Sequence, residues 1–140
     1  MDARVKWIDG ARFVGESGSG HALVIDGPPE HGGRNTGPRP MELVLLGLGG
    51  CASFDVVDIL KKSRADVTHC EVELRAERAD AVPAVFTRVH MHFVVRGRGL
   101  KEKQVARAVS LSAEKYCSAS KMLEDGGVIL SHDHAIEDEA

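Results

Sequence analysis

The chain has 140 residues, of which 43% are hydrophobic, and carries a formal net charge of −3. This length suits one domain with one core, so we expect a single domain over residues 1–140. The basic residues are scattered and only one Trp and one Tyr are present, which argues against nucleic acid as a partner.

The N-terminal segment MDARVKWIDGARF carries charges throughout and contains no apolar run. It therefore does not resemble a signal peptide. The longest uncharged apolar run, residues 43–54, has about half the length that a bilayer span requires. We predict a cytoplasmic protein without a membrane partner.

Three short β-segments are expected at the start of the chain, at residues 5–8, 12–15 and 21–26, separated by turn residues such as Asp9 and Gly10. This spacing predicts a β-meander. Residues 27–39 are crowded with Gly and Pro, which continue neither helices nor strands. They are expected to form a loop.

A long helix is predicted from the Pro38–Pro40 region to about Lys62, because proline suits the first turn of a helix. The helix is apolar on nearly every side as far as Val57, which predicts burial all round. Glycines at positions 47, 49 and 50 would each cost about 1 kcal/mol relative to alanine. We therefore expect another backbone to approach the helix there.

One layer of sheet covers only one face of such a helix, so something else must cover the other face. A homodimer that shares its central helices meets this requirement. The alternative is that the second helix of the same chain packs on the remaining apolar face of the first helix.

Residues 70–77 and 85–96 alternate between apolar and polar side chains, with 79–84 as the turn of a hairpin. Helical spacing follows over 100–116, then a last strand at 128–136, and the final EDEA is expected to be a disordered tail. The predicted class is α+β with the order βββ-α-ββ-α-β, in which two central apolar helices pack on an antiparallel sheet.

Two of the three cysteines, Cys51 and Cys117, end predicted helical segments, whereas Cys70 lies in a predicted strand. Nothing indicates export, and a reducing compartment does not maintain structural disulfides. Two thiols on rigid apolar elements therefore favour redox chemistry. The alternative is that a free cysteine acts as a small buried hydrophobic residue, which is the expectation for Cys70.

The segment 37–51, with its PMELVL and GGC motifs, and the later SAEKYCSASKML resemble the OsmC/Ohr family of osmotically inducible and organic hydroperoxide resistance proteins. The resemblance covers nearly the whole chain. It implies an intertwined homodimer of α+β subunits with two active sites at the subunit interface.

The resemblance also implies a thiol peroxidase for organic hydroperoxides, with hydrogen peroxide as a second substrate. In that reaction Cys51 reacts with the peroxide, Cys117 condenses with the resulting sulfenic acid, and a cellular dithiol reduces the disulfide. No cofactor and no metal are implied.

In this family an arginine and a glutamate assist the reactive thiol. The family glutamate directly follows a proline, whereas here Met41 intervenes and Glu42 is the candidate. On an unbroken helix Glu42 lies about 180° from Cys51. Arg12 in an N-terminal strand and Arg39 in the loop before the helix are the candidates for the arginine.

The helix face that carries Cys51 also carries Asp55 and Asp58, so its nearest built-in charges are negative. This argues against a very reactive thiol unless a cation lies close by. Gly47, one turn earlier, leaves the sulfur open to a substrate.

A first alternative function is a non-enzymatic protein that binds an apolar small molecule in the interface cavity, with the cysteines only lining it. The apolar helix and its glycines would serve this function equally well.

A second alternative uses the histidine pairs His90/His92 and His132/His134, which each place two imidazoles on one face of a strand. Four convergent histidines would bind zinc or copper. Arg88 shares the face of the first pair, and a fixed cation disfavours a metal ion there. Solvated strand faces explain these histidines more simply.

Overall fold

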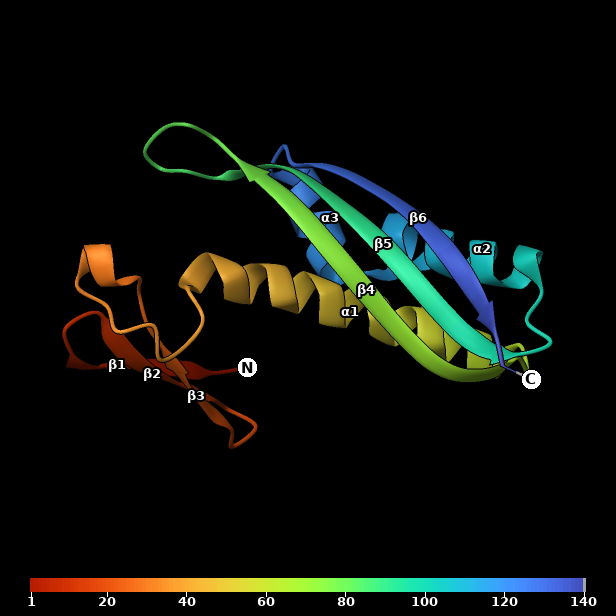
Figure 1. Ribbon diagram of the computed structural model, residues 1–140, viewed down its shortest axis with the longest axis horizontal. Coiled ribbons are helices and arrows are strands. Elements are labelled where there is room, and N and C mark those ends of the chain that lie inside the picture. Colours follow the sequence, from red (N-terminus) through yellow and green to blue (C-terminus); the bar gives the residue numbers. More distant parts are fainter. Residues whose placement is uncertain (140) are drawn as a thin grey trace. The chain divides into compact units, whose positions relative to one another are not determined.

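The computed structural model describes residues 1–139 (Figure 1). Its helices and strands follow the predicted order, with one additional helix before the last strand. The α+β class is therefore confirmed. The chain divides into two compact units, Met1–Leu46 and the part from Gly47 onward, and each unit has its own three-stranded sheet. The single domain over residues 1–140 stays a prediction.

The sheet of the first unit is built from β1 (Ala3–Asp9), β2 (Arg12–Ser17) and β3 (Ala22–Ile25). Both strand pairs are antiparallel and neighbouring strands follow one another in the sequence. The predicted meander is confirmed.

The loop after β3 is organised around Asp26, a carboxylate that is only 1% exposed. It accepts hydrogen bonds from the backbone amides of Gly27, Arg34 and Thr36 and from the Thr36 hydroxyl. These donors, the Thr36 hydroxyl foremost, hold the pKa of Asp26 well below its usual range. The Gly- and Pro-rich loop, which includes the short 3₁₀ turn η1 (Pro29–His31), therefore has a fixed centre.

Helix α1 (Pro40–Lys62) has the predicted start and end. At its start the backbone amide of Arg39 donates to Glu42 Oε1 at 2.8 Å. This is the contact by which a glutamate in the first turn satisfies the amide of the capping residue.

Burial along α1 follows one stripe, because every fourth residue from Leu48 onward is buried. These residues are Leu48, Ala52, Val56 and Leu60. Phe54, on the opposite side, is 71% exposed. Within one chain the helix is thus buried on one face, and the predicted burial all round is not met there.

By length and composition α1 could also cross a membrane, because its most apolar window has a mean hydropathy of 1.9. The sequence-based prediction of a membrane span considered only the uncharged run 43–54, so it did not recognise that the whole helix is long and apolar enough. Core helices of soluble proteins meet the same criterion, and α1 has a buried stripe, although only 28% of this window is buried within one chain.

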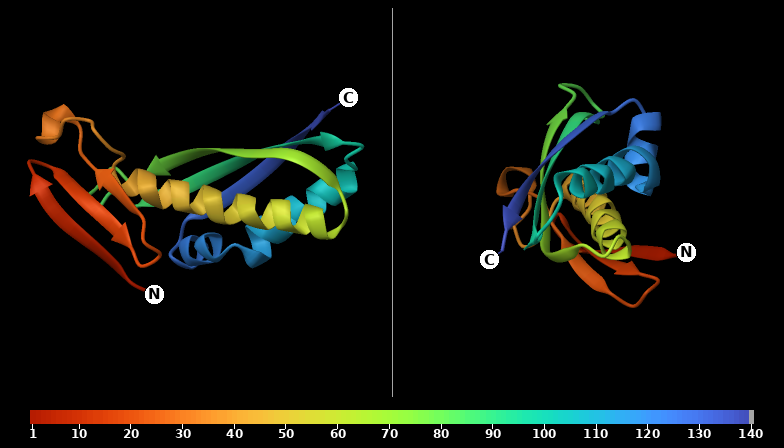
Figure 2. Two further views of the ribbon diagram at one scale, coloured as in Figure 1. Left: turned by 90° about the horizontal axis from the view of Figure 1, so that it is seen from below. Right: turned by 90° about the vertical axis from the view of Figure 1, so that its right-hand side faces the viewer.

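The sheet of the second unit contains β4 (Asp66–Arg78), β5 (Phe86–Arg98) and β6 (Ile129–Asp138), in that order. The predicted hairpin of β4 and β5 is confirmed. Strand β6 instead pairs with β5 in parallel, so the prediction of a wholly antiparallel sheet is wrong. Two helices between β5 and β6 form the crossover that a parallel pair requires. Helices α1, α2 and α3 cover one face of this sheet (Figure 2).

The crossover consists of α2 (Glu102–Leu111), a π-helical turn η2 (Ser112–Tyr116) and α3 (Ser118–Asp125). One helix over 100–116 was predicted, and α3 was missed. Cys117 adopts an extended conformation between η2 and α3, with φ −71° and ψ 109°. The sequence signal failed because α3 spans only about two turns, too few for its apolar spacing to stand out.

The mid-helix glycines of α1 have different surroundings. A Cβ on Gly49 would lie 2.8 Å from Leu74 Cδ1 and 3.3 Å from Val72 Cγ1, so this glycine lets α1 pack closely on β4. The close neighbours are side chains rather than the expected backbone. A Cβ on Gly47 or Gly50 would meet no atom of the described part of the chain within 4 Å.

The expected C-terminal tail is largely ordered. Strand β6 continues to Asp138, and the backbone amide of Glu139 donates to the Gly97 carbonyl at 2.8 Å. Of the EDEA segment only Ala140 lies outside the described residues.

Candidate functional site

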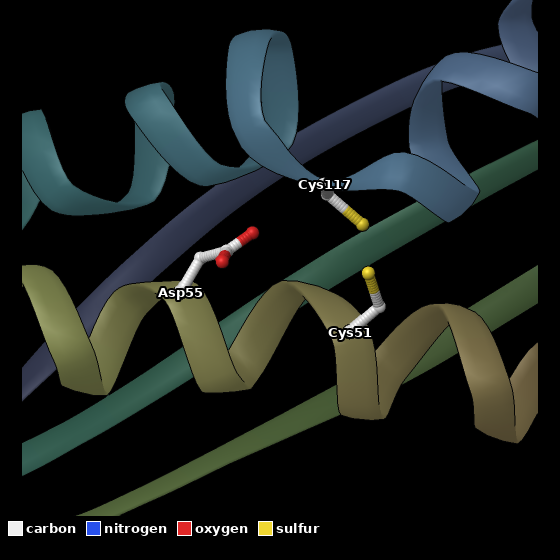
Figure 3. Close-up of side chains that lie close together, drawn as sticks. All are labelled: Cys51, Asp55 and Cys117. Atoms are coloured by element: carbon white, nitrogen blue, oxygen red, sulfur yellow. The ribbon is translucent and has the colours of Figure 1, made fainter.

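The two predicted redox cysteines lie side by side in the second unit (Figure 3). Cys51 projects from α1 and Cys117 from the junction between η2 and α3. Their sulfur atoms and a carboxylate oxygen of Asp55 all lie within 4.8 Å of one another. Both cysteines are free thiols. The fold thus brings together two thiols that are far apart in the sequence.

The π-helical turn η2 holds Cys117 against α1. The buried hydroxyl of Ser112 donates to the Ala52 carbonyl at 2.7 Å, and the Cys117 amide donates to the Ser112 carbonyl at 2.9 Å. Because Ala52 directly follows Cys51, these two bonds connect the backbones that carry the two sulfurs. Single π-turns often occur at functional sites.

Cys117 is 2% exposed. Its sulfur accepts a hydrogen bond from the backbone amide of Ser120 at 3.4 Å, at the start of α3. Burial raises the pKa of the Cys117 thiol above its ordinary value of 9.0, and the neighbouring Cys51 adds to the increase. The hydrogen bond from the Ser120 amide opposes this shift without cancelling it. Cys117 is therefore protonated at neutral pH, whereas Cys51 is the more exposed of the two thiols.

Asp55 is the third member of the cluster, and its Oδ2 is buried without a hydrogen-bond partner among residues 1–139. Burial raises the pKa of Asp55, the charge of Asp58 raises it further, and the Ser112 hydroxyl offsets part of the change. The Ser112 proton already points to the Ala52 carbonyl. Asp55 was recognised in the sequence only as a charge on the face of Cys51, since it follows that residue by one helical turn.

A cavity of about 500 Å³ lies beside Asp55, between α1 and the segment of α2 and η2. Its walls mix charged and apolar side chains. They are Asp55, Asp58, Ile59, Lys62, Ser63, Arg107, Leu111 and Tyr116.

The three other predicted site residues lie in the first unit, each with a local partner. Arg12 forms a two-pronged ion pair with Asp9, with both N···O distances 2.8 Å. Arg39 Nη1 donates to Asn35 Oδ1 at 2.7 Å, and Glu42 accepts from the Arg39 amide.

Cys70 lies half-buried on β4, where it pairs in register with Val95 of β5. Burial raises the pKa of its thiol, and the charge of Glu71 contributes to the same shift. A raised pKa disfavours the reactive thiolate. Its expected structural role stays a prediction.

The four strand histidines form two separate pairs. His90 Nε2 and His92 Nδ1 lie 2.9 and 2.7 Å from Asp133 Oδ1. His132 and His134 have different acidic neighbours, at 3.6 and 2.7 Å, which are Glu114 and Glu102.

The parallel register explains this separation. It aligns Asp133 with His92, whereas His132 and His134 align with the buried residues Met91 and Phe93. Because successive side chains of a strand point to opposite faces, the two pairs lie on opposite faces of the sheet. The four-histidine metal site considered from the sequence is therefore wrong.

Comparison with known proteins gives consistent matches. The model of the OsmC-like protein family matches residues 32–132. Protein YhfA of Escherichia coli K12 is 50% identical over 139 residues, which cover 97% of this chain and 98% of YhfA.

Solved structures also match over nearly the whole chain. A hypothetical protein of Aquifex aeolicus VF5 has a TM-score of 0.85 and 27% identity, covering 99% of this chain and 97% of that one. An organic hydroperoxide resistance protein OsmC from Legionella pneumophila has a TM-score of 0.70 and 16% identity, covering 96% and 95%. The second likeness shows the fold alone.

The raised pKa of Asp55 predicts a pH-dependent effect on stability. A carboxylate with a folded-state pKa above its ordinary value of 3.8 lowers the unfolding free energy once it ionises, so its cost develops as the pH rises from about 4 through the raised pKa. Asp55→Asn should therefore raise Tm relative to the native chain at pH 7 but not at pH 3, as measured by thermal denaturation.

Asp58→Asn is the matched control, because Asp58 is partly exposed and pairs with Lys62 at 2.8 Å. It should not produce the same gain at pH 7. An Asp55→Asn variant with the same Tm difference at both pH values would contradict the assigned burial cost.

Proposed function

The chain belongs to the OsmC-like protein family, and from this we propose that it is a thiol peroxidase that reduces organic hydroperoxides in defence against oxidative stress. The observation that carries the proposal is the approach of the Cys51 and Cys117 sulfurs to within 4.8 Å. Membership of the family and the name of the Legionella relative support the choice of substrate.

The different exposure of the two thiols supports distinct roles. Cys51 is partly exposed, so a peroxide can reach it. Cys117 is buried and its pKa is raised, which makes it a poor first nucleophile. We therefore assign Cys51 as the peroxidatic thiol and Cys117 as the resolving thiol.

The reaction has three balanced steps. The Cys51 thiolate attacks the peroxide, the O–O bond breaks, and the products are a Cys51 sulfenic acid and an alkoxide, which takes a proton from solvent to become the alcohol. Cys117 then forms a disulfide with Cys51 and releases water. A dithiol reductant restores both thiols by exchange. Hydrogen peroxide would react by the same route and release water in place of the alcohol.

A cation near the sulfur would stabilise the departing alkoxide. We propose Arg12 or Arg39 as this cation, with Glu42 as the carboxylate that assists it. Glu42 accepts a hydrogen bond from the backbone amide of Arg39, so these two residues are neighbours at the start of α1.

We further propose that the protein acts as a cytoplasmic homodimer. Gly47, Gly50 and Phe54 share one face of α1, opposite to its buried stripe. No atom of residues 1–139 lies within 4 Å of a Cβ added to either glycine. A second copy of the chain would cover this apolar face, as the resemblance to the family implies.

The alternative function is the binding of an apolar ligand without chemistry in a cavity at the dimer interface. The exposed apolar side chain of Phe54 on α1 would serve this function as well as the peroxidase.

Single-turnover kinetics with cumene hydroperoxide test the peroxidase. The native chain should consume one peroxide per chain in the absence of a reductant, and Cys51→Ser should consume none. Cys117→Ser should also consume one but accumulate a sulfenic acid that dimedone traps, because no second thiol removes it.

Cys70→Ser is the control and should behave as the native chain. If the native chain leaves the peroxide intact with both thiols free, the peroxidase is refuted and the binding alternative is favoured.

The activating arginine is tested by Arg12→Met and Arg39→Met, with Arg4→Met on the exposed strand β1 as the control. At least one of the first two should slow the oxidation of Cys51 about 100-fold, the typical cost of losing one group that stabilises developing charge. Glu42→Gln should reduce the rate only if Arg39→Met does. Native rates in both arginine variants would exclude this role.

Sedimentation velocity tests the homodimer. The native chain of 15.1 kDa should sediment at twice that mass. Phe54→Glu should shift the equilibrium toward the monomer, because it places a charge on the face proposed to be buried. Met122→Glu, at an exposed position of α3, should leave the dimer intact. A native chain that sediments as a monomer at micromolar concentration would contradict the proposal.

A further inference from the structure

The formation of the disulfide poses a proton problem that the two cysteines do not solve alone. When the Cys117 sulfur attacks the Cys51 sulfenic acid, an S–S bond forms, the S–O bond breaks and hydroxide leaves. The Cys117 thiol must lose its proton and the hydroxide must gain one. Cys117 is 2% exposed and protonated at neutral pH, so solvent has little access to this proton.

Asp55 is placed to carry this proton. Its carboxylate lies within 4.8 Å of both sulfurs, a distance that one bridging water can span. In Figure 3 the Asp55 side chain projects from α1 toward the segment that carries Cys117.

The hydrogen bonding of Asp55 also supports a role in the transfer of the Cys117 proton. Buried polar atoms in native proteins nearly always have partners, so an orphaned oxygen requires an explanation. Within residues 1–139 only two buried side-chain atoms lack a partner, Asp55 Oδ2 and Ser120 Oγ, and both belong to residues that neighbour Cys117.

We propose that Asp55 accepts the proton of the Cys117 thiol as Cys117 attacks the oxidised sulfur of Cys51, and delivers it to the departing hydroxide as water forms. The inference rests on the proposed function, because it assigns the proton transfer of its second step. The raised pKa of Asp55 makes the carboxylate a stronger base than an exposed aspartate.

The other titratable or charged groups around Asp55 come from α1, α2 and the segment that follows. They are Cys51, Asp58, Lys62, Arg107, Tyr116 and Cys117. Lys62 is paired with Asp58. Asp55 is the carboxylate that reaches both sulfurs and also lines the cavity, so it can exchange its proton with solvent between turnovers.

The test measures the attack of Cys117 without any peroxide. In a Cys70→Ser background, the uncharged reagent dithiodipyridine forms a mixed disulfide with Cys51 and releases one thiopyridone. Cys117 then attacks this disulfide and releases a second thiopyridone, so two optical phases report the two thiols separately. The second phase needs the same removal of the Cys117 proton.

Asp55→Asn should slow the second phase about 100-fold at pH 7, the scale of a lost general base. It should not slow the first phase, because it removes a negative charge beside Cys51. Asp58→Asn should leave both phases at native rates. With Asp55 present, the second-phase rate should be flat between about pH 7 and 8.5, whereas in Asp55→Asn it should rise about tenfold per pH unit as thiolate forms.

A native second-phase rate in Asp55→Asn would overturn the inference. So would a second-phase rate that rises tenfold per pH unit in the chain that retains Asp55. The pH dependence of the second-phase rate in the chain that retains Asp55 tests the inference even if the Asp55→Asn variant does not fold. If the chain consumes peroxide but its second-phase rate does not depend on Asp55, only this inference is refuted. If the chain leaves peroxide intact but its second-phase rate depends on Asp55, only the proposed peroxidase function is refuted.

Discussion

The site depends on the contact between the π-helical turn η2 and helix α1. The Ser112 hydroxyl donates to the Ala52 carbonyl, one residue beyond Cys51, and the chain then turns so that Cys117 faces the same helix. Helix α1 is in turn fixed to the sheet by its buried stripe and by the close approach of Gly49 to β4. The distance between the two sulfurs is therefore set by the packing of the second unit.

This packing also sets the electrostatics of the cluster. The burial of Cys117 and the partial burial of Asp55 raise the pKa of each group, and the same packing leaves Cys51 more exposed than Cys117. A buried carboxylate oxygen without a hydrogen-bond partner, such as Asp55 Oδ2, costs stability. A proton-transfer role for Asp55 would explain why that cost is tolerated.

Much of the fold could be predicted from the sequence, because apolar spacing and turn residues locate long elements well. Cys51 and Cys117 were both candidates from the sequence, but their proximity, which the structure shows, followed only from the family resemblance. Helix α3 and the parallel pairing of β6 were missed, since a short helix has weak periodicity and strand direction depends on the crossover. Asp55 shares the face of Cys51 in the sequence, yet its lack of a partner depends on Ser112, which lies on a distant segment.

The central claim is that Cys51 and Cys117 form one redox pair. Peptide mass spectrometry under non-reducing conditions, after one equivalent of cumene hydroperoxide, tests it most directly. A disulfide that links the Cys51 and Cys117 peptides, with Cys70 still free and the bond reversed by a dithiol, is the predicted result. Recovery of both peptides as free thiols after the peroxide has been consumed, or a disulfide that involves Cys70 instead, would contradict the claim.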